Sequence, residues 1–163
     1  MTRRYSESRG RRLSAYEASV ERFAASRAGA WVFRTAVAPL DRRTGAAVSR
    51  VLRVPVGTLE TTGALTGRPR RTALLYHRDG EALVVVASNY GREGDPAWLR
   101  NLRAQPRVRF RTDRWRDYTA RVADAAERAR RWPAATDFYA GYGVYAGRTV
   151  REIPLVVLEP AWA

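Results

Sequence analysis

Two strand-forming segments, residues 71–77 and 82–88, flank the tripeptide Arg78-Asp79-Gly80, and this arrangement constrains the fold more than any other part of the sequence. An Asp-Gly pair between two such segments is a strong signal for a tight β-hairpin. The second segment contains the uninterrupted apolar run Leu83–Ala87. A strand without polar alternation is covered on both faces, so we expect this strand at the centre of a sheet.

Other segments show the alternation of apolar and polar residues that is typical of half-buried strands. In one of them, Val108, Phe110 and Thr112 alternate with arginines, which predicts a strand with a wet, basic face. About six strands with few long helices favour an α+β protein built on an antiparallel or mixed barrel, not on a doubly wound sheet. The predicted strands are 54–61, 71–77, 82–88, 107–112, 116–123 and 153–158. The predicted helices are 96–104, with Asp95 as its N-cap, 124–132, and a further short helix that opens at Pro133.

The first 53 residues differ in character from the rest of the chain. Residues 1–12 predict a flexible basic arm, and residues 13–53 predict an amphipathic helix followed by a connecting segment. One interpretation packs this helix on its own domain, and the alternative places it as a peripheral contact on an anionic membrane surface. No segment approaches the roughly 18 apolar residues of a spanning helix. We therefore expect a cytoplasmic protein, in the second case peripheral to the inner face of the membrane.

The composition excludes several kinds of catalytic chemistry. The chain of 163 residues contains no cysteine and no lysine, so all 30 basic residues are arginines. Thiol nucleophiles, cysteine-ligated metals, Schiff bases and a Walker A lysine are therefore excluded. The single histidine, His77, excludes a multi-histidine metal site, and its place beside the hairpin predicts an exposed strand-end residue rather than a base. We expect no metal, and in an enzyme a cofactor would carry the reaction.

The net charge of +14 favours a polyanionic partner: nucleic acid, an anionic membrane surface or a polyanionic small molecule. The most specific local feature is the segment from Thr61 to Arg71, with the sequence TTGALTGRPRR. Its two glycines let the backbone turn and expose N–H groups, and its guanidinium groups can bind phosphate or carboxylate in a bidentate manner. Taken alone, such a basic turn between strands is often only a solvated loop.

This segment resembles the Thr-Thr-Gly-(basic)-(basic)-Ser-Gly-x-x-Arg loop of the deazaflavin-dependent nitroreductase family. Further matches follow in order along the chain, and the similarity spans about residues 31–160. They are Ala87-Ser88-Asn89, Pro96-Ala97-Trp98, Asn101-Leu102, the tyrosines Tyr139, Tyr142 and Tyr145, Arg151-Glu152-Ile153-Pro154, and Leu158-Glu159-Pro160.

The resemblance implies a split β-barrel over residues 54–163 and binding of coenzyme F-420, an 8-hydroxy-5-deazaflavin. This hydride carrier has a phosphodiester and an oligoglutamate tail, so it is a long polyanion. Enzymes of this kind reduce quinones, nitro compounds or activated double bonds. By position, the resemblance implies that Thr66, Gly67, Pro69 and Arg70 hold the phosphate region, assisted by Arg71. Ala87, Ser88 and Asn89 would line the ring, with Trp98 and Asn101 on the helix beside it. Tyr139, Tyr142 and Tyr145 would face the acceptor, with Tyr142 first and Tyr139 next as the group that orients the acceptor or donates the proton.

The sequence departs from the family pattern at Ala64 and Leu65, where two basic residues are usual. Binding of the tail would then rely on other arginines. The structural alternative for the three tyrosines is a packed aromatic helix face. Two other functions stay open: a split-barrel protein that binds FMN, and a basic nucleic-acid-binding protein, for which no complete RNA-binding signature is present. For the oligomeric state, the sequence leaves a monomer or a weak dimer.

Overall fold

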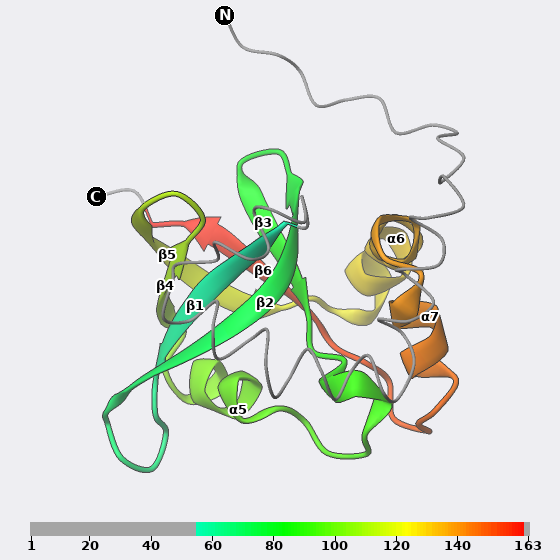
Figure 1. Cartoon of the computed structure of the whole chain (residues 1–163), viewed down its shortest axis with the longest axis horizontal. Helices are drawn as coiled ribbons and strands as arrows, with labels where there is room; N and C mark the ends of the chain where they lie inside the picture. The colour runs from blue at the N-terminus through cyan, green and yellow to red at the C-terminus, as the bar shows by residue number, and fades with distance from the viewer. Residues whose placement is uncertain (1–54, 162–163) are drawn as a thin grey trace, which may run out of the picture.

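Six strands form one closed barrel, in the order β1-β2-β3-β6-β5-β4, with β4 returning to β1 (Figure 1). The computed structural model describes residues 55–161, so the predicted arm and the predicted N-terminal helix lie outside the described residues. Every strand pair is antiparallel, which confirms the predicted barrel. The strands are β1 Val56–Thr62, β2 Pro69–Asp79, β3 Ala82–Val86, β4 Arg107–Arg111, β5 Trp115–Val122 and β6 Leu155–Pro160, and the helices are η2 Asn89–Gly91, α5 Ala97–Ala104, α6 Ala125–Phe138 and α7 Gly141–Ala146.

The predicted hairpin joins β2 and β3, and β3 lies between β2 and β6. The pairing of Asp79 with Ala82 leaves Gly80 and Glu81 as the two loop residues, so the turn falls one residue later than predicted. Gly80 has φ +61°, a conformation that glycine adopts without steric cost. Four of the five residues of β3 are buried, which confirms that this apolar strand is covered on both faces.

Two apolar cores explain why β3 does not alternate. Leu83 and Val85 point into the barrel, where they pack with Phe110 and with the buried face of α5. Val84 and Val86 point outward into a second core. That core lies under α6 and α7, which stand together at one side of the barrel (Figure 1).

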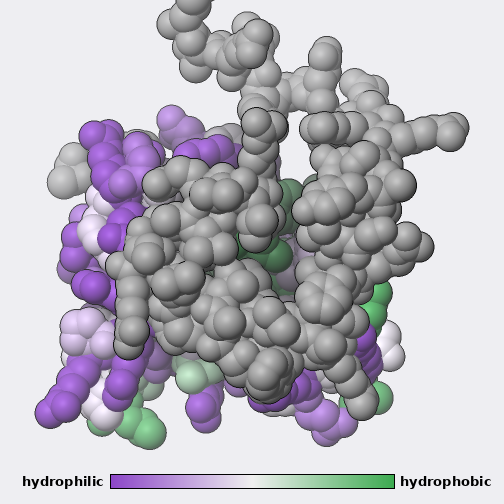
Figure 2. All heavy atoms as spheres, viewed as in Figure 1, coloured by the Kyte–Doolittle hydropathy of each residue, from purple (hydrophilic) through white to green (hydrophobic). Residues whose placement is uncertain are grey.

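Strand β4 has the predicted basic face. Arg107 and Arg109 are exposed, whereas Val108 and Phe110 are buried in the barrel. The guanidinium groups of Arg71, Arg109 and Arg111 lie 5.3, 5.2 and 5.0 Å from the centre of the Trp115 ring, within the range of cation–π attraction. Figure 2 shows a mainly hydrophilic surface on the side where the β4–β5 hairpin lies.

Two predicted helix boundaries are wrong. Asp95 does not cap α5: its carboxylate pairs with Arg103 and Arg151 instead, and Pro96 takes the N-cap position. Pro133 does not open a separate helix but lies inside α6. Pro133 has no N–H group to donate to the carbonyl oxygen of Ala129, one helical turn earlier. Because Ala129 is exposed, water can bind this oxygen instead. Among residues 55–161, no helix combines the length and the apolarity that a membrane crossing requires.

A buried carboxylate ties the start of α6 to β5. Arg121 donates two hydrogen bonds to Glu127, and Arg131 donates a third at 3.0 Å. The hydrogen bond from Arg121 is the main cause that lowers the pKa of Glu127. A carboxyl whose pKa is lower in the folded state stabilises the fold above its unfolded pKa, and it loses this contribution as the pH falls through the folded pKa.

We therefore expect Glu127→Gln to lower the melting temperature at pH 7. The difference in melting temperature between the variant and the wild type should shrink as the pH falls below about 4, which is near the pKa of a glutamate in the unfolded chain. Thermal unfolding at several pH values measures this difference. Glu159→Gln is the control, because Glu159 also accepts from Arg121 but is half exposed. A difference for Glu127→Gln that stays constant from pH 7 to pH 3 would contradict the assignment.

Candidate active site

A cleft of about 810 Å³ lies between the β1–β2 turn and the exposed side of α5. It has the size of a typical small-molecule or cofactor site. The turn and the start of β2 form one wall, and the first residues of α5 form the other. The lining residues are Gly63, Ala64, Leu65, Thr66, Pro69, Arg70, Arg71, Thr72, Ala97, Trp98, Arg100 and Asn101. Six of the predicted cofactor-binding residues meet here: Thr66, Pro69, Arg70, Arg71, Trp98 and Asn101.

The amide groups of the β1–β2 turn are used within the fold, contrary to the expectation that the glycines expose them. The Gly63 N–H donates to the Arg68 carbonyl at 2.9 Å, and the Thr66 and Gly67 N–H groups donate to the Gly63 carbonyl at 3.2 and 2.8 Å. The Thr66 hydroxyl accepts from the Arg68 N–H at 3.4 Å. An anion in this cleft would therefore meet mainly guanidinium groups rather than a nest of amides.

Asn101 holds the turn against α5. Its carbonyl oxygen accepts from the Ala64 N–H at 3.0 Å, and its amide nitrogen donates to the Thr61 hydroxyl at 3.1 Å. Thr61 is itself buried at the end of β1. Both ends of the Asn101 amide are engaged, so this residue fixes the shape of the cleft, a role that the sequence prediction of a ring contact did not include.

The cleft carries a positive charge. Its lining contains three arginines, Arg70, Arg71 and Arg100, and no carboxylate. Arg71 already donates at 2.7 Å to Glu60, which does not line the cleft. Within residues 55–161, neither Arg70 nor Arg100 forms an ion pair, so both guanidinium groups are available to an anionic ligand.

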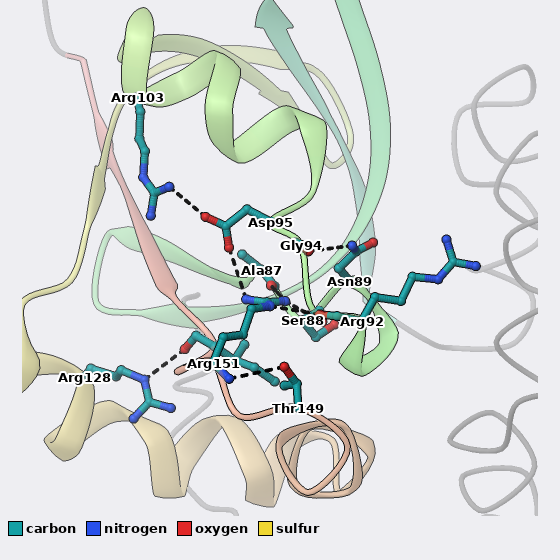
Figure 3. Close-up of polar contacts among 11 residues, drawn as sticks. Ala87, Ser88, Asn89, Arg92, Gly94, Asp95, Arg103, Arg128, Thr149 and Arg151 are labelled. Carbon is teal, nitrogen blue, oxygen red and sulfur yellow. Dashed lines mark hydrogen bonds and ion pairs between the residues drawn. The ribbon is translucent and has the colours of Figure 1, made fainter.

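The predicted ring-binding residues Ala87, Ser88 and Asn89 lie outside this lining, in the connection between β3 and α5. Ala87 is buried in the barrel core, whereas Ser88 and Asn89 are half-buried. Figure 3 shows this connection wrapped around the Arg151 guanidinium. It continues from β3 past η2 to α5, and η2 packs on α7. The connection therefore links the cleft to the helix that carries two of the predicted tyrosines.

The three tyrosines form one aromatic cluster. Tyr142 and Tyr145 are buried on α7, whereas Tyr139 is half-buried and caps the end of α6 instead of lying on the short helix with the others. The Tyr139 ring meets the Tyr142 ring edge to face at 5.1 Å, and the Tyr139 and Tyr145 hydroxyls are 3.4 Å apart. Burial raises the pKa of Tyr142 and of Tyr145, so both stay protonated at neutral pH.

His77 is not the exposed residue that we predicted. Its ring packs against Phe138 with 5.4 Å between the centroids, and it is half-buried. Burial, followed by the nearby Arg131, lowers the pKa of His77, so its imidazole is neutral at pH 7. His77 does not line the cleft, and within the described residues no group of histidines and carboxylates is arranged to hold a metal ion.

Comparison with known proteins assigns this chain to an enzyme class. The family described as F-420H(2)-dependent quinone reductase matches residues 31–160. An F-420H(2)-dependent quinone reductase of Mycobacterium tuberculosis is 41% identical over 104 residues, which cover 61% of this chain and 70% of that protein. A solved structure of an F-420-H2 dependent reductase is 33% identical with a TM-score of 0.60, over 64% of this chain and 94% of that chain.

A second solved structure, described as a domain-swapped dimer, is 28% identical with a TM-score of 0.60 and covers 74% of this chain and 99% of that one. The matched family spans most of the sequence, and the fold agrees with it. The chain belongs to the F-420H(2)-dependent quinone reductase family. The family, the split barrel and the dependence on coenzyme F-420 that the sequence predicted are thereby confirmed.

Proposed function

We propose that this protein reduces a quinone with a hydride from reduced coenzyme F-420, which binds in the cleft between the β1–β2 turn and α5. The observation that carries the proposal is the cleft itself: about 810 Å³, lined by three arginines and no carboxylate, in a chain of this family. Nitro compounds and activated double bonds are the other acceptor classes that the predicted chemistry allows.

The lining residues fit the coenzyme. Arg70 and Arg100 would hold its phosphodiester and the carboxylates of its tail, since guanidinium groups bind both in bidentate geometry. Thr66 lies on the same wall as Arg70, and Pro69 and Trp98 supply apolar surface for a flat ring system. Because Ala64 and Leu65 replace the usual basic pair, Arg70 and Arg100 would carry most of the attraction for the tail.

Reduction of a quinone requires a hydride and a proton, and bound, reduced coenzyme F-420 supplies the hydride. The residues of this chain orient the acceptor and hold a proton near its oxygen. Positioning of this kind can contribute several kcal/mol to catalysis. The tyrosine cluster fits the second task, because its buried hydroxyls keep their protons at neutral pH. Tyr139 is the half-buried member, so we place it ahead of the buried Tyr142 as the group that meets the acceptor.

We expect Tyr139→Phe to lower the turnover number about tenfold, which corresponds to one lost hydrogen bond in the transition state. Tyr142→Phe should change it less, within about threefold, because Tyr142 is buried in the core under α7 and has less access to an acceptor. Both variants should bind oxidised coenzyme F-420 like the wild type. Steady-state kinetics and a fluorescence titration test these expectations. A larger loss in Tyr142→Phe than in Tyr139→Phe would reverse the order of the two residues.

The activity itself is tested by mixing the protein anaerobically with reduced coenzyme F-420 and a soluble naphthoquinone. We expect oxidised coenzyme to form in step with loss of the quinone, and FMN in its reduced form not to substitute. A nitroaromatic compound and an enone serve as the competing acceptors. Failure to oxidise the coenzyme with the quinone, while another acceptor is reduced, would reject the quinone and keep the cofactor.

A further inference from the structure

The connection between β3 and α5, residues 87–96, contains an unusual backbone conformation. Asn89, Tyr90 and Gly91 follow one another with φ values of 46°, 59° and 76°. The left-handed region is open to glycine but disfavoured for residues with a side chain, and two such residues in succession are rare. A stretch of this kind persists only where its surroundings hold it. Another group must therefore hold residues 89–91 in place.

The guanidinium group of Arg151 reaches both ends of this stretch (Figure 3). Its Nη2 donates to the carbonyl oxygens of Ala87 and Ser88 at 3.0 and 2.9 Å. Its Nε donates to the carbonyl oxygen of Arg92 at 2.9 Å, and its Nη1 lies 3.2 Å from the carboxylate of Asp95. One side chain thus binds the backbone before the left-handed residues and the backbone after them.

Neighbouring contacts reinforce this arrangement. The second oxygen of the Asp95 carboxylate lies 2.7 Å from Arg103 on α5, so the Arg151 cluster is also tied to the helix that lines the cleft. Asn89 donates from its side chain to the carbonyl oxygen of Gly94 at 2.7 Å. The Arg151 side chain is only 15% exposed, so these hydrogen bonds are largely protected from competing water.

The connection is in direct contact with the aromatic cluster. Tyr90 packs edge to face on Tyr145, with 6.0 Å between the ring centroids. Gly91 approaches α7 so closely that a Cβ atom there would lie 2.8 Å from the Tyr145 carbonyl oxygen. Ser88 and Asn89, which the family resemblance places at the deazaflavin ring, directly precede these two contact residues in the chain.

We propose that Arg151 is a positioning residue for hydride transfer. By fixing residues 87–95, it keeps Ser88 and Asn89, which are expected at the coenzyme ring, in a constant position relative to the tyrosine cluster. This inference rests on the proposed function, because it takes the cleft to hold coenzyme F-420. Arg151 acts through the connection and touches neither coenzyme nor acceptor. Lysine cannot replace it, since a single ammonium group lacks the planar fork that meets three carbonyls and a carboxylate at once.

The test compares Arg151→Lys and Arg151→Met with the control Arg103→Met. Arg103 shares Asp95 but has no contact with the backbone of the connection among the described residues. The first measurement is hydrogen exchange of the Gly91 and Arg92 amides, which donate to the carbonyls of Ser88 and Asn89. Both Arg151 variants should exchange these amides about tenfold faster, while the barrel strands keep their protection and Arg103→Met stays within about twofold of the wild type.

The second measurement is the affinity for oxidised coenzyme F-420 together with steady-state kinetics. We expect the dissociation constant to rise about tenfold in both Arg151 variants, with a matching fall of kcat, whereas the KM for the quinone changes less. Faster exchange with unchanged affinity and kcat would overturn the positioning role, and unchanged exchange would overturn the clamp itself. If the wild type binds no coenzyme, the proposed function fails, while the exchange result still decides whether Arg151 holds the connection. Arg151→Lys keeps the charge and serves if Arg151→Met does not fold.

Discussion

Replacing Arg70 by alanine is expected to weaken the binding of oxidised coenzyme F-420 roughly ten- to hundredfold. A hydrogen bond to a charged group contributes about 1.5–3 kcal/mol, and about 1.4 kcal/mol corresponds to a factor of ten. Arg70 lines the cleft and forms no ion pair with any residue of the 55–161 region, so nothing there competes with the ligand for its guanidinium group. Arg71 should matter less, because it donates to Glu60.

A titration of coenzyme fluorescence at constant salt concentration measures this effect. Arg130→Ala is the matched control: it removes the same charge from an exposed position on α6 that does not line the cleft. We expect the control to bind almost as tightly as the wild type, and its small loss to disappear as salt rises. Equal affinities for Arg70→Ala and Arg130→Ala would place the phosphodiester elsewhere.

Replacing Phe110 by alanine is expected to lower the free energy of unfolding by about 3–5 kcal/mol, the usual cost of removing a large aromatic side chain from a core. Phe110 is 1% exposed and packs edge to face with Tyr76 at 5.4 Å and with Tyr118 at 6.5 Å. Its ring also lies over Gly57, where a Cβ atom would come within 2.1 Å of it. The Phe110 ring therefore fills the space that a side chain at position 57 of β1 would otherwise occupy.

Urea denaturation followed by circular dichroism measures the loss. Val150→Ala is the control, since Val150 is fully exposed, and we expect a change within about 0.5 kcal/mol. The coenzyme should stabilise both variants against urea by mass action, because the cleft is formed by other residues. A loss below 1 kcal/mol for Phe110→Ala would show that the barrel interior is packed differently from the structure described above.

The strands could be predicted because their patterns are local. Two-residue alternation identified β4 and β5, and the unbroken apolar run identified β3 as the central strand that two cores cover. The helix boundaries at Asp95 and Pro133 failed for tertiary reasons. Asp95 is drawn away from the helix end by Arg103 and Arg151, and the exposed carbonyl opposite Pro133 makes an internal proline tolerable.

The TTGALTGRPRR segment identified one wall of the cleft. The roles of the residues that surround this segment could not be predicted from the sequence. The hydrogen bonds of Asn101 with Ala64 and Thr61 join residues about 40 positions apart in the sequence, so no local pattern predicts them. The same holds for Arg151, whose partners are 56–64 residues away. The Arg-Glu-Ile-Pro match drew attention to Arg151 without indicating what it binds. The cytoplasmic location, the membrane contact of residues 13–53 and the choice between monomer and weak dimer stay predictions.

The decisive measurement is an equilibrium titration of the purified full chain with oxidised coenzyme F-420 and, in parallel, with FMN at moderate salt concentration. We predict saturable binding of the deazaflavin and no comparable binding of FMN, since the three arginines of the cleft match the longer and more negative ligand. Tight binding of FMN alone would keep the fold and contradict the assigned cofactor. Binding of neither, together with steeply salt-dependent binding of nucleic acid, would contradict the oxidoreductase function of this chain.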